Sequence, residues 1–202
     1  SPPYDNIEGS GYGKGVKDVL FLKLYSEFFG KFLGEIHRVL KPTGQFYLNL
    51  KSGTINKTLV TPHWIEFIPE FKQFKLKSYI IWKYAGSFDS TKKRFHLDYE
   101  IIYHLSKTDD IEINYDDDEH DPLTSVWYIP HNIPKDQRVH PVQMPDALAE
   151  RIIKRGSKEG ELILDPFAGS GTSIVVGQKL KRKCIGMEIN PHNIELINRR
   201  LS

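Results

Sequence analysis

The C-terminal third of the sequence predicts an α/β fold built on a parallel sheet. Residues 162–165 form an apolar run typical of a buried strand, and this run ends in a turn that contains two glycines. A helix over residues 172–180 and a second strand over residues 184–187 follow. Residues 191–201 then form an amphipathic helix, with Ile194 and Ile197 expected to face inward. Strands that alternate with helices in this way are joined by crossovers, which makes them parallel.

The N-terminal part also contains one helix and several strands. Residues 25–40 carry apolar side chains three and four positions apart, which predicts an amphipathic helix, and Lys41-Pro42-Thr43-Gly44 ends it. A short strand over residues 45–50 follows directly. Two longer β-branched and aromatic runs, residues 75–84 and residues 97–105, are predicted to pair with each other.

The remaining segments are a helix and two polar connections. Residues 145–155 have apolar side chains on one helical face, and residues 49–61 are polar and connecting. The acidic run at residues 116–119 predicts a solvated loop tip in preference to a metal site, because adjacent carboxylates repel one another and need water. No metal site is expected.

Composition bounds the class of protein. The 202 residues, of which 39% are hydrophobic, suffice for one substantial core. The formal charge of +2 is too small for a protein that coats nucleic acid, so any such affinity must come from a local patch. The lone Cys184 and the absence of any apolar run of roughly 20 residues favour a reducing, cytoplasmic setting without a membrane span.

A nucleoside-binding site is predicted at the glycine turn. The turn and its flanks read Asp165-Pro166-Phe167-Ala168-Gly169-Ser170-Gly171-Thr172. A strand that runs into such a turn and then a helix exposes backbone N–H groups at the sheet edge where α/β proteins bind ligands. Glu188 ends the next strand, where its carboxylate could accept both hydroxyls of a ribose. Ile174 stands where a dinucleotide fingerprint has its third glycine, which disfavours NAD. The alternative is a tight turn with no ligand.

The first four residues, Ser1-Pro2-Pro3-Tyr4, can be read either as a frayed tail or as a rigid catalytic loop. Prolines fix the backbone of the loop. The Ser1 hydroxyl and the Pro2 carbonyl are acceptors that suit the hydrogens of an exocyclic base amine, whose nitrogen is otherwise a poor nucleophile. Tyr4 offers a flat face on which an extruded base can stack.

Taken together, these segments resemble the amino-methyltransferases of restriction-modification systems over nearly the whole chain. The resemblance rests on short matches in the family's order, which are Ser1-Pro2-Pro3-Tyr4, residues 40–44, Ile81-Trp82-Lys83-Tyr84, Val126-Trp127, His140-Pro141-Val142-Gln143-Met144-Pro145 and residues 164–172. Tyr99-Glu100 departs from the His-Glu pair common in the family, so no role is carried onto it. Core packing is expected for Trp82 and Trp127.

The resemblance implies a Rossmann-like fold that binds S-adenosylmethionine, with a mostly parallel sheet, helices on both faces and a permuted order. A single domain would then comprise a catalytic half (residues 1–105), a small target-recognition insertion (residues 106–139) and a cofactor half (residues 140–202). His140 leads into the cofactor half and is expected near the cofactor, as a cap or packing residue and not as a catalyst.

The implied activity is site-specific methylation of an exocyclic amine in double-stranded DNA after base flipping. Ser1 and the apolar Met144 favour cytosine N4, whereas Gln143 is closer to the pattern of adenine-N6 enzymes, which stay an alternative. A methyltransferase for RNA or protein glutamine is disfavoured by Ser1, and a non-catalytic DNA-binding subunit with a vestigial cofactor pocket is the alternative from another class.

The same resemblance suggests partners. The candidate phosphate contacts are Lys92, Lys93, Arg94 and Arg138, for which plain surface charge is the alternative. A homodimer and a cognate restriction endonuclease in a prokaryotic cytoplasm fit the family. In the family, two strands precede the catalytic loop, one of them beside the strand that ends at Asp165. Since this sequence begins at that loop, we expect a further N-terminal segment or another chain to supply those strands.

Overall fold

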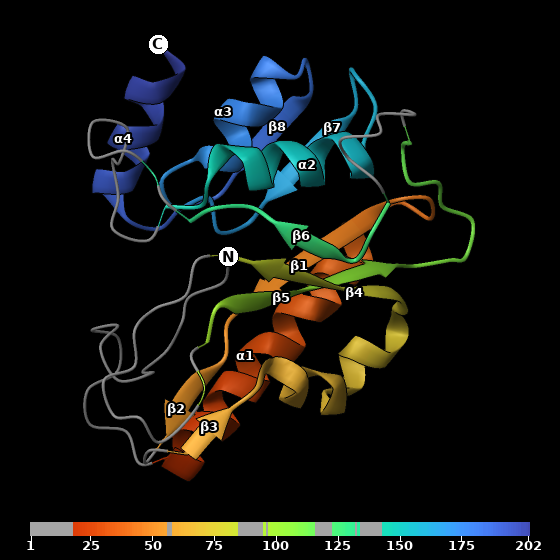
Figure 1. Ribbon diagram of the computed structural model, residues 1–202, viewed down its shortest axis with the longest axis vertical. Helices are drawn as coiled ribbons and strands as arrows, with labels where there is room; N and C mark the ends of the chain where they lie inside the picture. Colours follow the sequence, from red (N-terminus) through yellow and green to blue (C-terminus); the bar gives the residue numbers. More distant parts are fainter. Residues whose placement is uncertain are drawn as a thin grey trace. The chain divides into compact units, whose positions relative to one another are not determined.

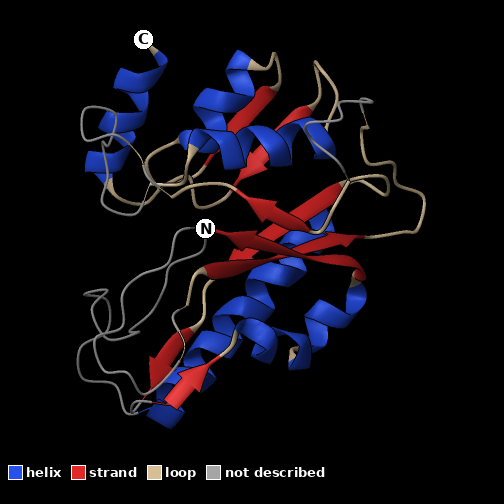
Figure 2. Cartoon of the chain, in the orientation of Figure 1, coloured by secondary structure: helices blue, strands red, loops and turns tan. Residues whose placement is uncertain are grey.

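The computed structural model describes residues 18–55, 58–84, 95, 97–115, 123–131, 133 and 143–202. The described residues divide into two compact units. The first unit comprises residues 18–81 and 99–111, and the second comprises residues 82–98 and 112–202 within the described ranges. Figure 1 labels the helices and strands, and Figure 2 separates helix from strand by colour.

The first unit is a sheet with one long helix on one of its faces (Figure 1). Helix α1 covers Asp18–Val39, and the strands are β1 (Gln45–Leu50), β4 (Lys75–Lys83) and β5 (Tyr99–Ser106). The last two residues of β4 belong to the second unit. Strand β5 lies between the other two, as the predicted pairing of residues 75–84 with 97–105 requires. Strands β1 and β5 run antiparallel, with Leu48 opposite Tyr103. The antiparallel pair is a local departure from the parallel arrangement expected for the sheet.

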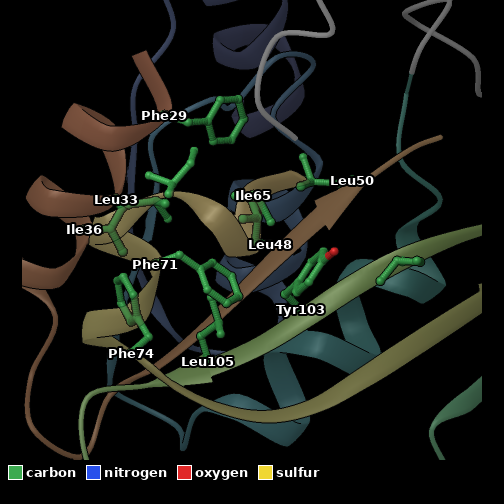
Figure 3. Packing of buried hydrophobic residues seen from close by; sticks show 12 residues of the cluster. Phe29, Leu33, Ile36, Leu48, Leu50, Ile65, Phe71, Phe74, Tyr103 and Leu105 are labelled. Atoms are coloured by element: carbon green, nitrogen blue, oxygen red, sulfur yellow. The ribbon is translucent and has the colours of Figure 1, made fainter. Parts of the chain in front are cut away.

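The core of the first unit lies between α1 and this sheet (Figure 3). Phe29, Leu33 and Ile36 are almost fully buried, and their spacings of four and three put them on one helical face. Alternate residues of β1, Leu48 and Leu50, meet them from the sheet. The apolar stripe predicted for residues 25–40 is therefore the buried face of α1.

Two short 3-10 helices and a hairpin complete the first unit, and the sequence patterns predicted neither feature. The helices η1 (Pro62–Phe67) and η2 (Pro69–Gln73) each begin with a proline, whose fixed φ suits a first helical position. Their residues Ile65 and Phe71 pack into the core. Strands β2 (Gly53–Ile55) and β3 (Thr58–Val60) form an antiparallel pair within the segment that was expected to be only connecting.

The second unit contains the predicted strand-helix-strand-helix order. It consists of α2 (Asp146–Gly156), β7 (Leu162–Asp165), α3 (Thr172–Lys179), β8 (Lys183–Gly186) and α4 (Pro191–Leu201). Strands β7 and β8 are parallel, with Leu164 beside Ile185. A short strand β6 (Val126–Tyr128) is followed by Ile129, whose N–H donates to the Lys83 carbonyl at 3.1 Å. The α/β class and the parallel pairing of these two strands are confirmed.

Among the described residues of this unit, helices cover one face of the β7–β8 sheet and leave the other partly exposed. Ile163 packs with a cluster formed by Ala149 and Ile153 of α2 and Val176 of α3. Leu162 and Leu164, which point the other way, are 55% and 37% exposed. The prediction of a buried strand is thus correct for one face and wrong for the other, because α2 and α3 pack on the same side.

Helix α4 is rotated relative to the prediction. Ile197 faces inward as expected, but Ile194 is 42% exposed and Asn193 is buried in its place. The packed stripe therefore runs through residues 193, 197 and 200, which are spaced by four and three. Within the described residues, no helix has both the length and the apolarity needed to cross a membrane.

Candidate functional site

The glycine turn after β7 takes the form that the sequence predicts. Gly169 and Gly171 have φ values of +54° and +77°, a region that residues with a side chain rarely adopt. Gly171 is the N-cap of α3, so the chain passes from strand to helix within the turn. A Cβ atom at Gly169 would meet nothing closer than the Phe167 carbonyl oxygen at 3.9 Å, which leaves space next to the backbone there.

Asp165 organises the turn from the end of β7. Its Oδ1 accepts the backbone N–H of Phe167 at 3.0 Å, and its Oδ2 accepts a short hydrogen bond from the Ser173 hydroxyl. The carboxylate thus joins the strand end to the first turn of α3, where a negative charge also interacts favourably with the helix dipole. Asp165 holds the shape of the site, and Ser173 is a member of the site that the sequence reasoning missed.

Glu188 follows β8 and reaches the same turn. Its Oε2 accepts the backbone N–H of Gly169, and its Oε1 accepts that of Asn190, both at 2.8 Å. An ionised carboxylate has about four acceptor positions, so each oxygen can still accept a hydroxyl donor. The predicted ribose role is therefore compatible with the structure, and Glu188 has a second role as a brace for the turn.

Backbone hydrogen bonds keep the two strand ends together. The Met187 N–H donates to the Asp165 carbonyl at 2.9 Å, and the Ala168 N–H donates to the Met187 carbonyl at 2.8 Å. Asn190 caps α4 by accepting the N–H of His192 at 3.0 Å, with Pro191 in the first turn. An asparagine before a proline suits this cap, because Asn is a favoured N-cap and Pro a favoured first helical residue. The turn and the two carboxylates thus form one connected group, and the residues present fit a nucleoside with a ribose diol.

Several predicted site residues lie outside the described residues. They are Ser1, Pro2, Pro3, Tyr4, Lys92, Lys93, Arg94, Arg138 and His140. The structure brings together the remaining ones, which are Asp165, Phe167, Ala168, Gly169, Ser170, Gly171, Thr172 and Glu188. These residues therefore form one connected group, and the assignments to cofactor, catalytic loop and DNA contacts all stay predictions.

The two tryptophans of the family segments are core residues. Trp82 is 2% exposed and its indole N–H donates to the Ile129 carbonyl at 2.8 Å. Trp127 is 5% exposed, donates to the Thr124 carbonyl at 2.8 Å, and has the Arg151 guanidinium 4.6 Å from its ring centroid. Their buried positions confirm the packing interpretation over base stacking.

Glu100, the second residue of the Tyr99-Glu100 pair, is also buried. It accepts a hydrogen bond from the Asn49 side-chain amide at 2.7 Å. Met144 packs against the α2–α3 cluster, and the neighbouring Gln143 is buried. Among the described residues, no group of three or more His, Cys, Asp or Glu side chains could hold a metal ion.

Comparison with known proteins identifies relatives along the full chain. A family model described as "DNA methylase" matches residues 1–199. DNA adenine methyltransferase YhdJ of Escherichia coli (strain K12) is 31% identical over an alignment of 227 positions, which covers 99% of this chain and 74% of that protein. The chain spans 62% to 74% of the length of four curated relatives that it matches.

Solved structures share the fold. The cytosine-N4-specific PvuII DNA methyltransferase matches with a TM-score of 0.81 at 19% identity, over 100% of this chain and 77% of that chain. M1.HpyAVI in complex with S-adenosylmethionine (SAM) matches with a TM-score of 0.71 at 22% identity, over 87% of this chain and 83% of that chain. The Rossmann-like methyltransferase fold expected from the sequence is confirmed.

Proposed function

The chain belongs to the DNA methylase family whose model matches residues 1–199, and we propose on this basis that it transfers a methyl group from S-adenosylmethionine to an exocyclic amine in double-stranded DNA. The observation that carries the proposal is the constellation of the glycine turn, Asp165 and Glu188 at the ends of two parallel strands. This group provides backbone donors and a carboxylate that fit a nucleoside with a free ribose diol.

Each part of the cofactor site has a distinct task in this proposal. Glu188 binds the ribose hydroxyls with the acceptor positions that its backbone contacts leave available. Gly169 would let the cofactor approach the backbone, because it has no side chain to intervene. Asp165 keeps the turn in the binding conformation through Phe167 and Ser173. S-adenosylmethionine supplies an activated methyl group on a sulfonium sulfur.

The loop formed by Ser1, Pro2, Pro3 and Tyr4 holds the target base. The Ser1 hydroxyl and the Pro2 carbonyl accept the two amine hydrogens, which raises the electron density on the nitrogen. Tyr4 stacks on the flipped base and keeps the nitrogen in line for attack. The nitrogen then bonds to the methyl carbon, the carbon–sulfur bond breaks with its electron pair going to sulfur, and the nitrogen releases one proton to water.

Cytosine N4 is the proposed target. Ser1 supports it, as do the apolar Met144 and the fold shared with a methyltransferase described as cytosine-N4-specific. Adenine N6 is the second candidate, which Gln143 and the 31% identity to a DNA adenine methyltransferase favour. The charged residues Lys92, Lys93, Arg94 and Arg138 are proposed as phosphate contacts. A prokaryotic cytoplasmic setting, a homodimer and a cognate endonuclease belong to the same proposal.

The identity of the methylated base tests the proposal directly. Unmethylated duplex DNA is incubated with the protein and methyl-labelled S-adenosylmethionine, then digested to nucleosides that are separated and identified. Labelled N4-methyldeoxycytidine is the expected product, and Ser1→Ala protein is the control for contaminating activity. Labelled N6-methyldeoxyadenosine would overturn the cytosine assignment. Cofactor binding without any labelled base would point to the alternative of a DNA-binding subunit with a vestigial pocket.

A further inference from the structure

Helix α4 buries one of two neighbouring arginines. The side chain of Arg200 is 15% exposed, whereas that of Arg199 is 75% exposed and pairs with Glu195 on the surface. Asn193 and Ile197 share the packed side of the helix with Arg200. Arginine is rarely buried unless its charge and its donors have partners. The contacts of Arg200 therefore indicate what this side of α4 does.

The guanidinium of Arg200 connects the glycine turn to another helix. Its Nη1 donates to the Ser170 carbonyl at 2.6 Å and lies 3.3 Å from the Thr172 hydroxyl. Its Nη2 lies 3.7 Å from a carboxylate oxygen of Asp146, the first residue of α2. A planar fork with five N–H donors can serve all three acceptors at once, which a lysine ammonium cannot do in the same geometry.

The contact with Ser170 controls the backbone at the start of α3. Because a peptide unit is planar, the direction of the Ser170 carbonyl also sets the direction of the Gly171 N–H. That N–H donates to the Ala168 carbonyl at 2.7 Å and closes the turn. The guanidinium thus holds the peptide on which the turn depends, from outside the turn itself.

Helix α4 also leaves no room at Gly171. A Cβ atom there would lie 2.7 Å from Cγ1 and 3.2 Å from Cγ2 of Ile197. The apolar contact and the guanidinium contact come from residues three positions apart on the same side of α4. The two contacts act on adjacent residues of the turn, so α4 fixes the turn both by shape and by hydrogen bonding.

We propose that Arg200 is a positioning residue for S-adenosylmethionine, which pre-organises the glycine turn for binding and couples it to the start of α2 through Asp146. The inference rests on the proposed cofactor role of the turn. Without the guanidinium, the Ser170 peptide can rotate, so the turn is no longer fixed before S-adenosylmethionine binds. Binding of the cofactor must then order the turn, at a cost in free energy. Since that cost falls on binding, the affinity for the cofactor decreases while the chemistry at the base is unaffected.

Calorimetric titration with S-adenosylmethionine in the absence of DNA measures the effect. Arg200→Met keeps much of the aliphatic length and removes the donors, and Arg199→Met is the matched control one residue away. We expect Kd to rise about tenfold for Arg200→Met, the factor that corresponds to about 1.4 kcal/mol, and to stay within about twofold for Arg199→Met. Arg200→Lys should give an intermediate Kd because it retains the charge and some donors.

Steady-state kinetics separates positioning from general damage to the fold. The expected pattern for Arg200→Met is a raised KM for S-adenosylmethionine with an unchanged kcat at saturating cofactor and an unchanged KM for DNA. A lower kcat and a higher KM for DNA, of the same size as the rise in KM for S-adenosylmethionine, would overturn the inference. An unchanged Kd for S-adenosylmethionine would overturn it as well. If Arg200→Met fails to fold, Arg200→Lys and Asp146→Asn supply the same comparison with smaller expected changes, and a Kd unchanged in both would also overturn it.

Glu188→Gln shows which proposal has failed if the result is negative. A weakened affinity in Glu188→Gln together with a normal affinity in Arg200→Met would reject the positioning role and keep the cofactor site. Unchanged affinities in both variants would reject the glycine turn as the cofactor site, and the inference on Arg200 with it.

Discussion

The Glu188 carboxylate accepts the backbone N–H of Gly169 at 2.8 Å, and the two residues lie beyond the ends of the paired parallel strands β8 and β7. The acidic residue that ends one strand therefore braces the turn that follows the other. A second bond, from the Asn190 N–H to the same carboxylate, fixes its orientation. A carboxylate held at both oxygens loses little side-chain entropy when a ligand binds, which suits a residue proposed to bind two hydroxyls at once.

Replacing Glu188 with alanine is expected to weaken binding of S-adenosylmethionine. The ribose hydroxyls lose their charged acceptor, a loss of about 1.5 to 3 kcal/mol for hydrogen bonds to a charged group. The N–H groups of Gly169 and Asn190 lose their acceptor as well, which loosens the turn. Isothermal calorimetry measures the change in Kd.

Glu195→Ala is the control for the Glu188 variant, because Glu195 is an exposed carboxylate on α4 that pairs only weakly with Arg199. Its affinity for the cofactor should match that of the wild type. An unchanged Kd in Glu188→Ala would refute the ribose role.

Ser1→Ala and Tyr4→Ala are each expected to reduce methyl transfer without a matching loss of cofactor binding. Both residues are assigned to the base and neither to the cofactor. Removal of one pre-organised hydrogen-bonding group lowers kcat by about 100-fold or more in comparable sites. Rates of methyl transfer to DNA and calorimetric Kd values, measured on the same preparations, test the separation.

Ser10→Ala and Tyr12→Ala are matched controls, since the same two residue types recur in the segment that follows the loop. They should retain transfer activity close to that of the wild type. Parallel losses of transfer and cofactor binding in Ser1→Ala or Tyr4→Ala would mean that the loop is structural.

Sequence patterns predicted the elements that have clear local signals. The helix predicted over residues 191–201 has the bounds of α4, and Lys41-Pro42-Thr43-Gly44 marks the end of α1, so these boundaries agree closely with the structure. The turn at Gly169 and Gly171 was predictable because its backbone needs positive φ values. The 3-10 helices were not, since their period of three over so few residues leaves no 3.6-residue pattern to detect.

The rotation of α4 shows that local sequence patterns do not determine which residues of this helix are buried. Ile194 and Ile197 have the same apolar character in the sequence, yet one is 42% exposed and the other packs against Gly171. The burial of Arg200 could not be predicted for a related reason, because its acceptors Ser170, Thr172 and Asp146 are tertiary neighbours that lie at least 28 residues away from it in the chain. Packing between elements decides such contacts, and a single sequence carries no periodic signal for them.

Gly171→Ala is expected to destabilise the protein more than Gly160→Ala does. Both glycines have similar positive φ values, +77° and +81°, so each alanine carries a backbone penalty of about 1 to 2 kcal/mol. Only at Gly171 would the new Cβ also meet a neighbour, Cγ1 of Ile197 at 2.7 Å, whereas nothing lies within 4 Å at Gly160. Urea unfolding should show an additional loss of about 1 to 3 kcal/mol for Gly171→Ala.

The pair of glycine variants isolates the clash, because the backbone term is common to both. If Gly171→Ala and Gly160→Ala lose the same free energy of unfolding, α4 moves away from the new Cβ atom without a loss of stability. Gly171→Ala should also raise the Kd for S-adenosylmethionine, and Gly160→Ala should leave it unchanged. A normal Kd in Gly171→Ala would indicate that the turn tolerates the displacement of Ile197.

Acid is expected to destabilise the first unit through His104. Burial lowers the pKa of this histidine from 6.5 to about 4, with a smaller contribution from the positive charge of Lys77. Its ring stacks on Tyr47 with centroids 4.6 Å apart, and its Nε2 lies 2.9 Å from the side-chain oxygen of Gln45. Both contacts suit a neutral imidazole whose Nε2–H donates to that oxygen.

The stability lost in acid follows from the two pKa values of His104. Above pH 6.5 the ring is neutral in both the folded and the unfolded chain, so it adds no pH dependence. Between pH 6.5 and about 4 the unfolded chain binds a proton that the folded chain does not, so the free energy of unfolding falls as the pH falls. The full effect is about 3 kcal/mol, at 1.36 kcal/mol per pKa unit.

Urea titrations at about pH 7.5, 5.5 and 4.5 measure how the free energy of unfolding changes with pH. The proteins compared are the wild type, His104→Gln and His192→Gln. His104→Gln has a lower stability at neutral pH but should lose the part of the slope that His104 contributes, because no ring is left to bind the proton. His192 is exposed at the start of α4, so His192→Gln should follow the wild-type curve. An identical pH dependence in wild type and His104→Gln would show that the buried ring is protonated in the folded protein at the same pH as in the unfolded chain.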